Sequence, residues 1–540
     1  PGSLVGSEMC IRDSTKSDDV EQKIVDHYTY VLATDGDLQE PVALGAAAIA
    51  GHLGLKKLVV YYDANDAQIS GTVSRSDSVD YATVFDGLGW NVQTIDGHDH
   101  SAMHFAIETA KVMDKPSIII GNTIMAKGSA SMEKDHNTHG APLPQDEIDL
   151  TKEKLGLPDK KFYVPSEVID HFRTRYADLT NKAEKWSLCI DQLSMDSNLK
   201  NIIENTIFEK MVAVLEMPDF DTGEILATRK AFGAVLDSIA DSLPQLVGGS
   251  ADLEPSNYTG NFAKKFGDFT KNNHSGRNIP FGVREFPMAA MMNGMALHGG
   301  VIPFGGTFLV FADYERPALR MAAIQNVRVI HEFTHDSFYV GEDGPTHQPV
   351  EQAMSLRAIP NFNVYRPADA KETASCIKLA LKDKNTPSAL LLTRQGVSVF
   401  EKEQKQIDAD VSKGAYPVFE CDGLPEIVIL ATGSEVSLAI EVAKNLNNKR
   451  VRVVSMPCWE LYEQQSDDYK AELIPTRGNL KVSIEAGITH GWEKYIGNNG
   501  ISIGLNHFGS SAPASDLAEE FGFTPEKVIE KINEALKNLL

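Results

Sequence analysis

Short apolar runs alternate with longer amphipathic segments along most of the chain, which is the pattern of layered α/β domains. Near the start, apolar runs at residues 27–34 and 58–64 flank an Ala- and Gly-rich segment, residues 41–55, that predicts a closely packed helix. Further strands are predicted at residues 91–95 and 117–122. Strand, helix and strand in this order predict a parallel sheet, whose ligands bind at the carboxyl ends of the strands.

Two more α/β stretches follow a charged region, residues 146–195, that predicts amphipathic helix. Strands are predicted at 246–248, 328–333, 363–365 and 389–393, a long helix at 288–298, a strand, Gly turn and helix within 426–446, and strands at 451–455 and 481–485. The fold class is therefore α/β, with three consecutive domains and mainly parallel sheets. We expect the domains at residues 15–195, 205–405 and 414–540.

Composition restricts the partners of the protein. Its 540 residues carry 51 Lys and Arg against 75 Asp and Glu, and the net charge of −24 repels nucleic acid and anionic membranes. No apolar run is long enough to span a bilayer. The five cysteines form no CxxC pair, which argues against a disulfide framework or a zinc site and favours the cytoplasm. Residues 1–14 have no helical or strand period, and we interpret them as a remnant of cloning or sequencing.

Candidate metal ligands stand at the ends of the first two strands, in Asp35-Gly36-Asp37 and Asp63-Ala64-Asn65. Asp35 and Asn65 offer hard oxygen ligands for Mg²⁺ or Ca²⁺, and Gly36 lets the backbone approach a diphosphate. The alternative interpretation is two ordinary turns, because both sequences are common turn signals.

Candidate catalytic residues lie in FGVREFPMAAMMNGMALHGG and in the following TFLVFADYERPALRMAA. Glu285 stands at the head of an apolar helix, where a carboxylate is often only a favourable charge at the N-terminus. Phe308, Phe311 and Tyr314 recur at helical spacing, and such a stripe is more often core than part of a cofactor site.

The segment FTHDSFYVGEDGPTHQPVEQ combines His335, Asp343 and His347 with several turn-forming residues. A loop so rich in polar residues indicates a binding site, although a surface Ω-loop is an alternative. A metal-binding loop is disfavoured because the ligand spacing is irregular. Arg229 and Arg394 are possible partners of a sugar phosphate, because a guanidinium group donates two hydrogen bonds and stays charged; alone, each would be a surface charge.

Together these motifs resemble the transketolase family. The resemblance is carried by TDGDLQEPVALGAAAIAGHLGLKKLVVYYDAND, by the segments around Glu285 and Phe311, and by the loop from His335 to His347. It extends from about Asp26 to the C-terminus, with the motifs in the family's order. Family members begin with a longer N-terminal part, so the resemblance also implies an N-terminally truncated chain.

The resemblance implies thiamine diphosphate and Mg²⁺ (or Ca²⁺) as cofactors. Asp35, Asn65 and the carbonyl group of Ala67 would hold the ion, with Gly36 beside the diphosphate. Glu285 would be the catalytic carboxyl group beside N1′ of the aminopyrimidine, where its hydrogen bond activates the cofactor. The remaining implied cofactor contacts are Leu253, Phe308, Phe311, Tyr314 and His139.

The resemblance also implies the sugar-phosphate site. The phosphate would bind Arg229, Ser256, His335 and Arg394, and the sugar hydroxyls would bind Asp343 and His347. His139 would contact both diphosphate and substrate, and His139 and His347 would take part in catalysis. Family members are homodimers with active sites at the subunit interface, where Glu40 would meet Glu285 of the partner subunit.

The implied domains are a diphosphate-binding domain, a pyrimidine-binding domain and a C-terminal domain in which we find no catalytic motif. The implied reaction transfers a two-carbon ketol unit from xylulose 5-phosphate to ribose 5-phosphate or erythrose 4-phosphate, as in the pentose phosphate pathway and the Calvin cycle. Alternatives are a ketol transferase similar to dihydroxyacetone synthase, a subunit of a split enzyme, and a catalytically silent dimeric protein.

Overall fold

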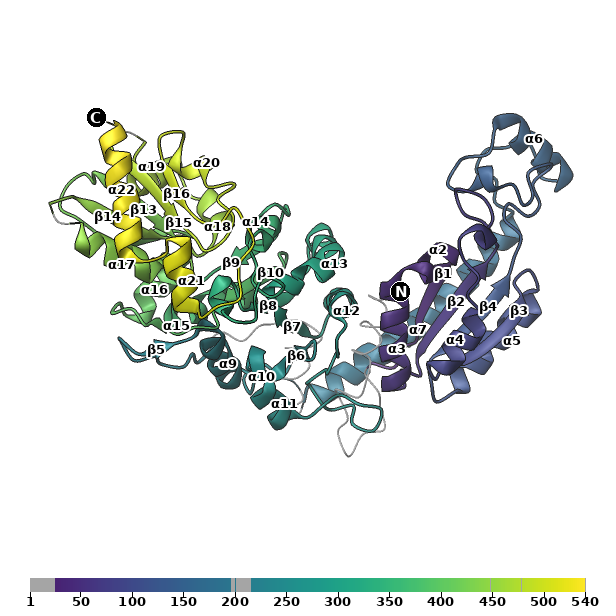
Figure 1. Cartoon of the computed structure of the whole chain (residues 1–540). Helices are drawn as coiled ribbons and strands as arrows, with labels where there is room; N and C mark the ends of the chain where they lie inside the picture. Colours follow the sequence, from purple (N-terminus) through teal and green to yellow (C-terminus); the bar gives the residue numbers. More distant parts are fainter. Residues whose placement is uncertain (1–24, 196–199, 201–214, 447, 477, 540) are drawn as a thin grey trace. The chain divides into compact units, whose positions relative to one another are not determined.

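The computed structural model describes residues 25–195, 200, 215–446, 448–476 and 478–539 (Figure 1). These residues form two compact units. The first holds the described residues of Pro1–Met211 with Phe269–Ser275 and His298–Gly300, and the second holds the others. Residues 1–14, interpreted above as a remnant, lie outside the described residues.

The first unit contains a four-stranded parallel sheet in the order β1-β2-β4-β3. Its strands are β1 (Thr29–Thr34), β2 (Leu58–Ala64), β3 (Asn91–Asp96) and β4 (Ser117–Asn122), and its first helices are α2 (Asp35–Gln39), α3 (Pro41–Leu53), α4 (Tyr81–Gly87) and α5 (His100–Val112). The first five residues of β4 are buried, because neighbouring strands and helices cover this central strand. The predicted strands at 58–64 and 117–122 are confirmed.

Small residues allow α3 to pack closely, as the sequence predicts. A Cβ atom on Gly51 would lie 1.9 Å from the carbonyl oxygen of Leu88. Trp90 is buried beside the helix, and its indole N–H donates a hydrogen bond to the carbonyl oxygen of Ala47 over 2.9 Å. Gly54 ends α3 in the left-handed conformation that favours glycine.

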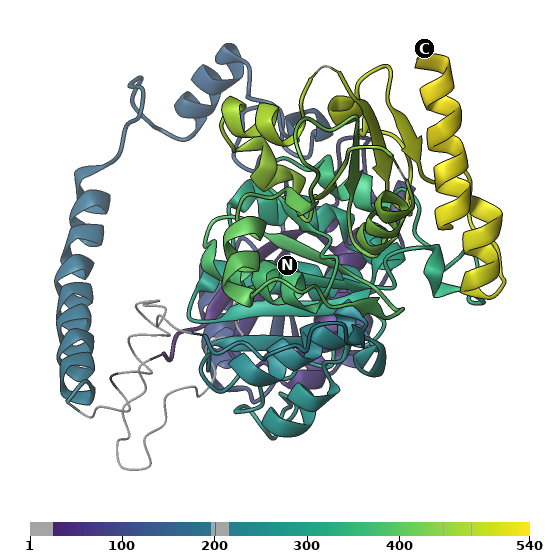
Figure 2. The ribbon, with the colours of Figure 1, turned by 90° about the vertical axis from the view of Figure 1, so that its left-hand side faces the viewer.

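The charged region predicted as amphipathic helix forms two helices, α6 (Gln145–Lys154) and α7 (Ser166–Leu193). α7 begins directly after Pro165 and runs as one long helix (Figure 2). Its aromatic side chains Phe172, Tyr176 and Trp186 are exposed. Most of the described core of the first unit comes from the sheet and helices α3 to α5, to which Leu38 of α2 and Ile190 of α7 also contribute. Two short 3₁₀ helices, η1 (Val73–Arg75) and η2 (His136–Thr138), lie in its loops.

The second unit contains two larger sheets and a two-stranded antiparallel pair, β5 (Ile225–Leu226) with β11 (Val397–Ser398). The second sheet is parallel, in the order β6-β7-β8-β10-β9. Its strands are β6 (Leu246–Ser250), β7 (Ile302–Phe308), β8 (Ile330–Thr334), β9 (Asn363–Tyr365) and β10 (Ser388–Leu392). Its helices are α9 (Thr228–Ile239), α10 (Glu254–Asn257), α11 (Gly260–Phe266), α12 (Glu285–His298), α13 (Ala312–Gln325), α14 (Gln352–Arg357) and α15 (Ala370–Lys382), with 3₁₀ helices η3 (Leu309–Phe311) and η4 (Phe338–Val340).

The third sheet has the order β12-β14-β13-β15-β16, and only β12 runs antiparallel to its neighbour. Its strands are β12 (Tyr416–Phe419), β13 (Ile427–Ala431), β14 (Val451–Ser455), β15 (Leu480–Ile484) and β16 (Ile501–Ile503). Its helices are α16 (Gln404–Val411), α17 (Glu435–Asn445), α18 (Trp459–Glu463), α19 (Asp467–Leu473), α20 (Glu493–Ile496), α21 (Ala514–Phe521) and α22 (Pro525–Leu539). Figure 2 shows α22, in yellow, along the outside of this layer.

Three successive α/β layers with mainly parallel sheets confirm the predicted fold class. The exact domain limits, 15–195, 205–405 and 414–540, stay predictions. No helix among the described residues is long and apolar enough to cross a bilayer.

Candidate active site

Asp35 and Asn65 follow neighbouring parallel strands at one edge of the first sheet. β1 and β2 pair with Thr34 opposite Asp63, so the residues after both strands emerge at the same edge. Asp35 begins α2, and the hydroxyl group of Tyr62 donates a hydrogen bond to its Oδ1 over 2.6 Å. The alternative of an ordinary turn is therefore wrong at Asp35, which starts a helix.

The oxygen atoms at this edge fit a hard divalent cation. Asp35 is 4% exposed, and its Oδ2 has no hydrogen-bond partner, which leaves a buried carboxylate oxygen available to a metal. Asn65 Oδ1 accepts a hydrogen bond from the amide of Ala67 over 3.0 Å, so the loop already brings residues 65 and 67 together. Among the described residues, no three His, Cys, Asp or Glu side chains form a metal cluster. A cation here would therefore need amide and carbonyl oxygens besides Asp35.

Two other predicted residues of the first unit, Glu40 and His139, are exposed. Glu40 is the N-cap residue of α3, but its side chain makes no capping hydrogen bond. His139 follows η2, where its backbone amide donates to the carbonyl oxygen of His136 over 3.0 Å. Both side chains are accessible, and their predicted roles stay predictions.

The carboxyl ends of the strands of the second sheet bring several predicted residues to one edge. Phe308, the last residue of β7, pairs with Thr334 at the end of β8, and Thr334 pairs with Leu392 at the end of β10. His335 follows Thr334 directly, and Arg394 comes two residues after Leu392. Residues far apart in sequence thus meet because their strands are parallel and end in register.

Arg229, Ser256 and His335 are in direct contact at this edge. Arg229 Nη1 donates a hydrogen bond to the carbonyl oxygen of Ser256 over 3.1 Å and lies 3.5 Å from Nε2 of His335. Burial, with the positive charges of Arg229 and Arg394, lowers the pKa of His335 to about 3. His335 is therefore neutral near pH 7, so it can bind an anion by donating a hydrogen bond rather than by carrying a charge.

Two threonines hold the arginines at this edge. The amide of Thr393 donates to Oγ1 of Thr228 over 2.7 Å, and the amide of Thr228 donates to Oγ1 of Thr393 over 3.0 Å. Both threonines are fully buried. Because Arg229 and Arg394 are their next neighbours in sequence, this reciprocal pair fixes the backbone beneath both guanidinium groups.

The three aromatic residues predicted from their spacing do not share one helix. Phe308 ends β7, Phe311 ends η3, and Tyr314 lies in the first turn of α13. Their rings follow one another, with centroids 5.8 Å apart for Phe308 and Phe311 and 6.0 Å for Phe311 and Tyr314. Phe308 is buried but Tyr314 is 64% exposed, so the interpretation as a core stripe is wrong for Tyr314.

The aromatic residues also contact the two loop histidines. The ring centroids of Phe308 and His335 lie 3.8 Å apart, and those of Phe311 and His347 lie 5.7 Å apart. The aromatic rings and the residues predicted to bind phosphate therefore adjoin at one edge of the sheet. Such an arrangement suits a ligand with a flat ring at one end and a polar group at the other.

Glu285 is the first residue of α12 and is 9% exposed. Burial raises the pKa of its carboxyl group, which favours the protonated form that can donate a hydrogen bond. A residue placed there only to favour the helix N-terminus would act as a carboxylate, so the raised pKa favours the catalytic interpretation.

Other predicted residues of the second unit are less closely joined. Leu253 is half-buried, and its amide donates to Oγ of Ser250 over 3.0 Å. Asp343 and Arg394 are exposed, and His347 is partly exposed. The loop from His335 to His347 is thus no surface Ω-loop throughout, because it begins buried and becomes exposed at Glu342.

Two groups of buried titratable side chains were not predicted from the sequence. Glu315 and His331 are fully buried, 3.1 Å apart, and burial followed by the charge of Glu285 raises the pKa of Glu315. Asp336 and Arg366 form a second buried pair, with Oδ2 and Nε 2.9 Å apart. Arg366 could have been found because it directly follows the apolar strand at 363–365.

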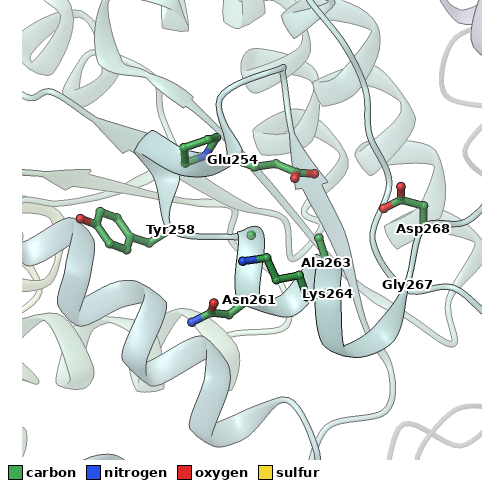
Figure 3. A pocket seen from close by; sticks show the side chains of 9 residues that line it. Glu254, Tyr258, Asn261, Ala263, Lys264, Gly267 and Asp268 are labelled. Atoms are coloured by element: carbon green, nitrogen blue, oxygen red, sulfur yellow. The ribbon is translucent and has the colours of Figure 1, made fainter.

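A cavity of about 640 Å³ opens beside α10 and α11 (Figure 3). Glu254, Tyr258, Lys264 and Asp268 are among its lining residues. The carboxylates of Glu254 and Asp268 both accept hydrogen bonds from Nδ2 of Asn278, over 2.9 and 2.7 Å. None of the predicted site residues is among its lining residues, but the guanidinium group of Arg229 lies 5.4 Å from the ring centroid of the lining residue Tyr258.

Comparisons with known proteins agree with this geometry. Residues 6–208 match the thiamine diphosphate binding domain of transketolase, residues 224–398 its pyrimidine binding domain, and residues 414–524 a transketolase-like C-terminal domain. The chain is 42% identical to a transketolase of Aquifex aeolicus over 95% of its own length and 74% of that protein. It is also 42% identical to a transketolase of Halalkalibacterium halodurans, over 95% and 78%.

Solved structures give the same result. The transketolase of Leishmania mexicana superimposes with a TM-score of 0.94 and 38% identity, over 99% of this chain and 79% of that chain. The transketolase of Campylobacter jejuni gives 0.89 and 36%, over 99% and 81%.

The match to the thiamine diphosphate binding domain assigns the chain to the thiamine diphosphate-dependent enzymes, and its parallel sheets agree with that class. The chain belongs to the transketolase family, whose members transfer ketol units. Thiamine diphosphate with a divalent metal is the cofactor of this family.

Proposed function

We propose that Asp35, Asn65 and the carbonyl oxygen of Ala67 hold the Mg²⁺ (or Ca²⁺) ion, with Gly36 beside the diphosphate. The support is the unpaired, buried Oδ2 of Asp35 and its position next to Asn65 on paired strands. Gly36 is the second residue of α2, and the space beside it is free, because an added Cβ would meet no atom within 4 Å. This space leaves room for a diphosphate to approach the backbone.

The edge of the second sheet holds the aminopyrimidine in this proposal. The protonated carboxyl group of Glu285 donates a hydrogen bond to the ring. The side chains of Phe308, Phe311, Tyr314 and Leu253 exclude water around the ring. Bound thiamine diphosphate supplies the electron sink that allows the C2–C3 bond of a ketose to break. The raised pKa of Glu285 supports its role, because only the protonated carboxyl group can donate.

The phosphate of the sugar binds Arg229, Ser256, His335 and Arg394, and the hydroxyl groups bind Asp343, His347 and His139. Proton transfer to and from the hydroxyl groups falls to His347 and His139. The single observation that carries this proposal is the contact of Arg229 with both Ser256 and His335, next to the ring of Phe308. This contact supports a phosphate site beside the aromatic rings.

The proposed donor is xylulose 5-phosphate, and the proposed acceptors are ribose 5-phosphate and erythrose 4-phosphate, as in the pentose phosphate pathway and the Calvin cycle. Structures of a Pichia stipitis transketolase, 35% identical to this chain, are titled as complexes with xylulose 5-phosphate and sedoheptulose 7-phosphate. A sequence identity of 35% supports related substrates for this chain as well as a shared fold.

We also propose a cytoplasmic homodimer in which Glu40 of one subunit meets Glu285 of the other. The exposure of Glu40 and the position of Glu285 at the start of its helix are compatible with such a contact. The unpaired thiols of Cys189, Cys376, Cys421 and Cys458 support a reducing compartment.

The proposed substrates are tested by mixing the protein with xylulose 5-phosphate and ribose 5-phosphate, with and without thiamine diphosphate and Mg²⁺. We expect sedoheptulose 7-phosphate and glyceraldehyde 3-phosphate only when both cofactors are present. Absence of these products, under conditions in which another ketose reacts, would contradict the proposed donor.

The phosphate site is tested by His335→Ala. Loss of its hydrogen bond should raise KM for a phosphorylated ketose about tenfold, and leave KM for the same ketose without phosphate unchanged. Equal changes for both sugars would assign His335 to something other than phosphate binding.

A further inference from the structure

The loop between β8 and α14, residues 335–350, carries three residues of the proposed substrate site. We call it the substrate loop. Each of His335, Asp343 and His347 has a sequence neighbour that is fastened, directly or through one residue, to the C-terminal domain, which carries the third sheet. The neighbours are Asp336, Glu342 and Gln348.

The first attachment runs through Arg366. Its Nε donates to Oδ2 of Asp336 over 2.9 Å. Its Nη1 donates to the carbonyl oxygen of Thr432 over 3.0 Å and to Oγ1 of Thr432 over 2.9 Å, and also pairs with Glu435. Asp336, Arg366 and Glu435 are at most 3% exposed, so water cannot replace these bonds without opening the structure.

The same network continues into the C-terminal domain. Thr432 Oγ1 donates to Oε1 of Glu485, and Arg357 binds both carboxylate oxygens of Glu485 over 2.8 and 2.9 Å. Gly433 has a φ of +56°, and a Cβ there would lie 2.8 Å from the guanidinium carbon of Arg366. The C-terminal domain thus surrounds Arg366 closely and fixes its orientation toward Asp336.

The second attachment is Gln348. Its Nε2 donates to the carbonyl oxygen of Gly341 over 2.7 Å, which ties the loop to itself, and to that of Ser510 over 2.9 Å. A Cβ on Gly509 would lie 1.6 Å from Oε1 of Gln348, so the backbone at residue 509 must approach this side chain closely. Gln348 is 2% exposed.

The middle of the loop is attached by a hydrogen bond and by aromatic packing. Oγ of Ser511 donates to the carbonyl oxygen of Glu342, next to Asp343. The ring of Phe338, in η4, lies 5.3 Å from that of Phe521 and 5.1 Å from that of Phe523. Three separate points of the loop are therefore held by the C-terminal domain.

The loop needs such support because parts of its backbone are unfavourable in isolation. His335 has a φ of +60°, in the left-handed region that a residue with a side chain rarely adopts. Residues in this conformation persist only where their surroundings fix them. Asp336, the next residue, is fixed by Arg366, and Thr334 Oγ1, on the other side, lies 2.8 Å from Nδ1 of His335.

We infer that the C-terminal domain positions the substrate loop, with Asp336, Arg366 and Gln348 as positioning residues. The residues alternate in function along the loop: one faces the substrate and its neighbour faces the C-terminal domain. This inference rests on the proposed substrate roles of His335 and His347.

The first test is Asp336→Asn, which keeps the size of the side chain and removes its charge. We expect KM for a phosphorylated ketose to rise about tenfold, with kcat within about twofold, because His335 shifts. KM for the same ketose without phosphate should not change. An unchanged KM for the phosphorylated ketose would overturn the inference for Asp336.

The second test is Gln348→Met, which keeps the length of the side chain but removes its two hydrogen bonds. Because His347 contacts sugar hydroxyls in the proposal, kcat/KM should fall about tenfold for both ketoses. The variant changes no charge and is expected to fold even if Asp336→Asn does not. Unchanged kcat/KM for both ketoses would overturn the inference for Gln348.

Ile532→Ala is the matched control, because Ile532 lies in the core of the C-terminal domain and is fully buried. It should lower the melting temperature without changing either KM. If it raises KM as Asp336→Asn does, general loss of stability explains both and the inference fails. His335→Ala, measured in parallel, separates the two proposals: if it raises KM and Asp336→Asn does not, only the positioning role is wrong.

Discussion

The edges of the first and second sheets both carry proposed site residues after parallel strands, but they are built differently. At the first edge, Asp35 and Asn65 directly follow adjacent strands, and a buried carboxylate oxygen has no hydrogen-bond partner. At the second edge, Arg229, His335 and Phe308 come from distant segments and already contact one another.

This difference concerns what completes each site. The first edge has a buried carboxylate oxygen without a hydrogen-bond partner, which a cation would satisfy. The second edge has its donors and rings held by buried hydrogen bonds, such as those between Thr228 and Thr393. We therefore expect changes at the first edge to affect cofactor affinity and changes at the second to affect turnover.

Glu285→Gln gives the largest expected effect at the second edge. Because Gln cannot transfer a proton, kcat for ketol transfer should fall by about 10²–10⁴-fold, with thiamine diphosphate still bound. Steady-state kinetics and calorimetric titration of the cofactor measure the two effects. Glu526→Gln, which removes an exposed carboxylate from the first turn of α22, is the control and should leave kcat unchanged. Normal turnover of Glu285→Gln would refute the assignment.

Asp35→Asn gives the corresponding effect at the first edge. Loss of an anionic ligand should weaken Mg²⁺-dependent binding of thiamine diphosphate by about 10–100-fold, while kcat at saturating cofactor changes less. Asp37→Asn is a matched control, because Asp37 accepts hydrogen bonds from Thr34 and is not a proposed ligand. If Asp35→Asn lowers only kcat, the expectation that the first edge affects cofactor affinity and the second affects turnover is wrong.

The stability of the second unit should depend on pH through the buried carboxyl group of Glu372. Burial and the charge of Asp369 raise the pKa of Glu372 to about 7, although Ser455 and Tyr416 donate hydrogen bonds to it. This pKa lies above that of a glutamate in the unfolded chain. The contribution of Glu372 to the free energy of unfolding is therefore fully present below about pH 4.3, and it is lost as the pH rises through about 7.

Melting curves between pH 5 and 8 test this expectation. The wild type should lose on the order of 2 kcal/mol from this group, whereas Glu372→Gln should show a flatter dependence even though it lacks one hydrogen bond from the amide of Ala368. Parallel pH profiles for the two proteins would show that Glu372 is ionised in the native state.

Asp99→Ala gives the smallest expected effect and concerns only the first unit. Asp99 Oδ1 accepts hydrogen bonds from the amides of Ser101 and Ala102 at the start of α5. Their loss should cost about 1 kcal/mol of stability without changing kcat or cofactor affinity. A loss of cofactor affinity, measured by calorimetric titration, would mean that the first edge depends on distant parts of its unit.

Much of the fold could be predicted from the sequence because buried parallel strands are short, continuous apolar runs. The strands at 58–64, 117–122, 363–365 and 451–455 have the predicted bounds. β7 was missed because its sequence, IPFGGTF, contains Pro and two Gly. These glycines are needed: a Cβ on Gly305 would lie 2.7 Å from the side chain of Met292.

The site was predicted in part. Motifs and the family resemblance pointed to residues that lie at two sheet edges in the structure, and the roles of these residues stay predictions. The sequence could not show which buried side chains hold them, because Asp336 and Arg366 are thirty positions apart and meet only through the order of the strands. Helical spacing misled for Tyr314, because a strand and a 3₁₀ helix precede it.

The shared charges of the second unit also have a consequence for how it unfolds. Arg357 and Arg366 belong to the layer of the second sheet, whereas Glu435 and Glu485 belong to that of the third. If either layer opened alone, the other would keep buried charges without partners, a state of high free energy. The two layers should therefore melt together in one cooperative transition, so this unit behaves thermodynamically as a single domain although it has two sheets.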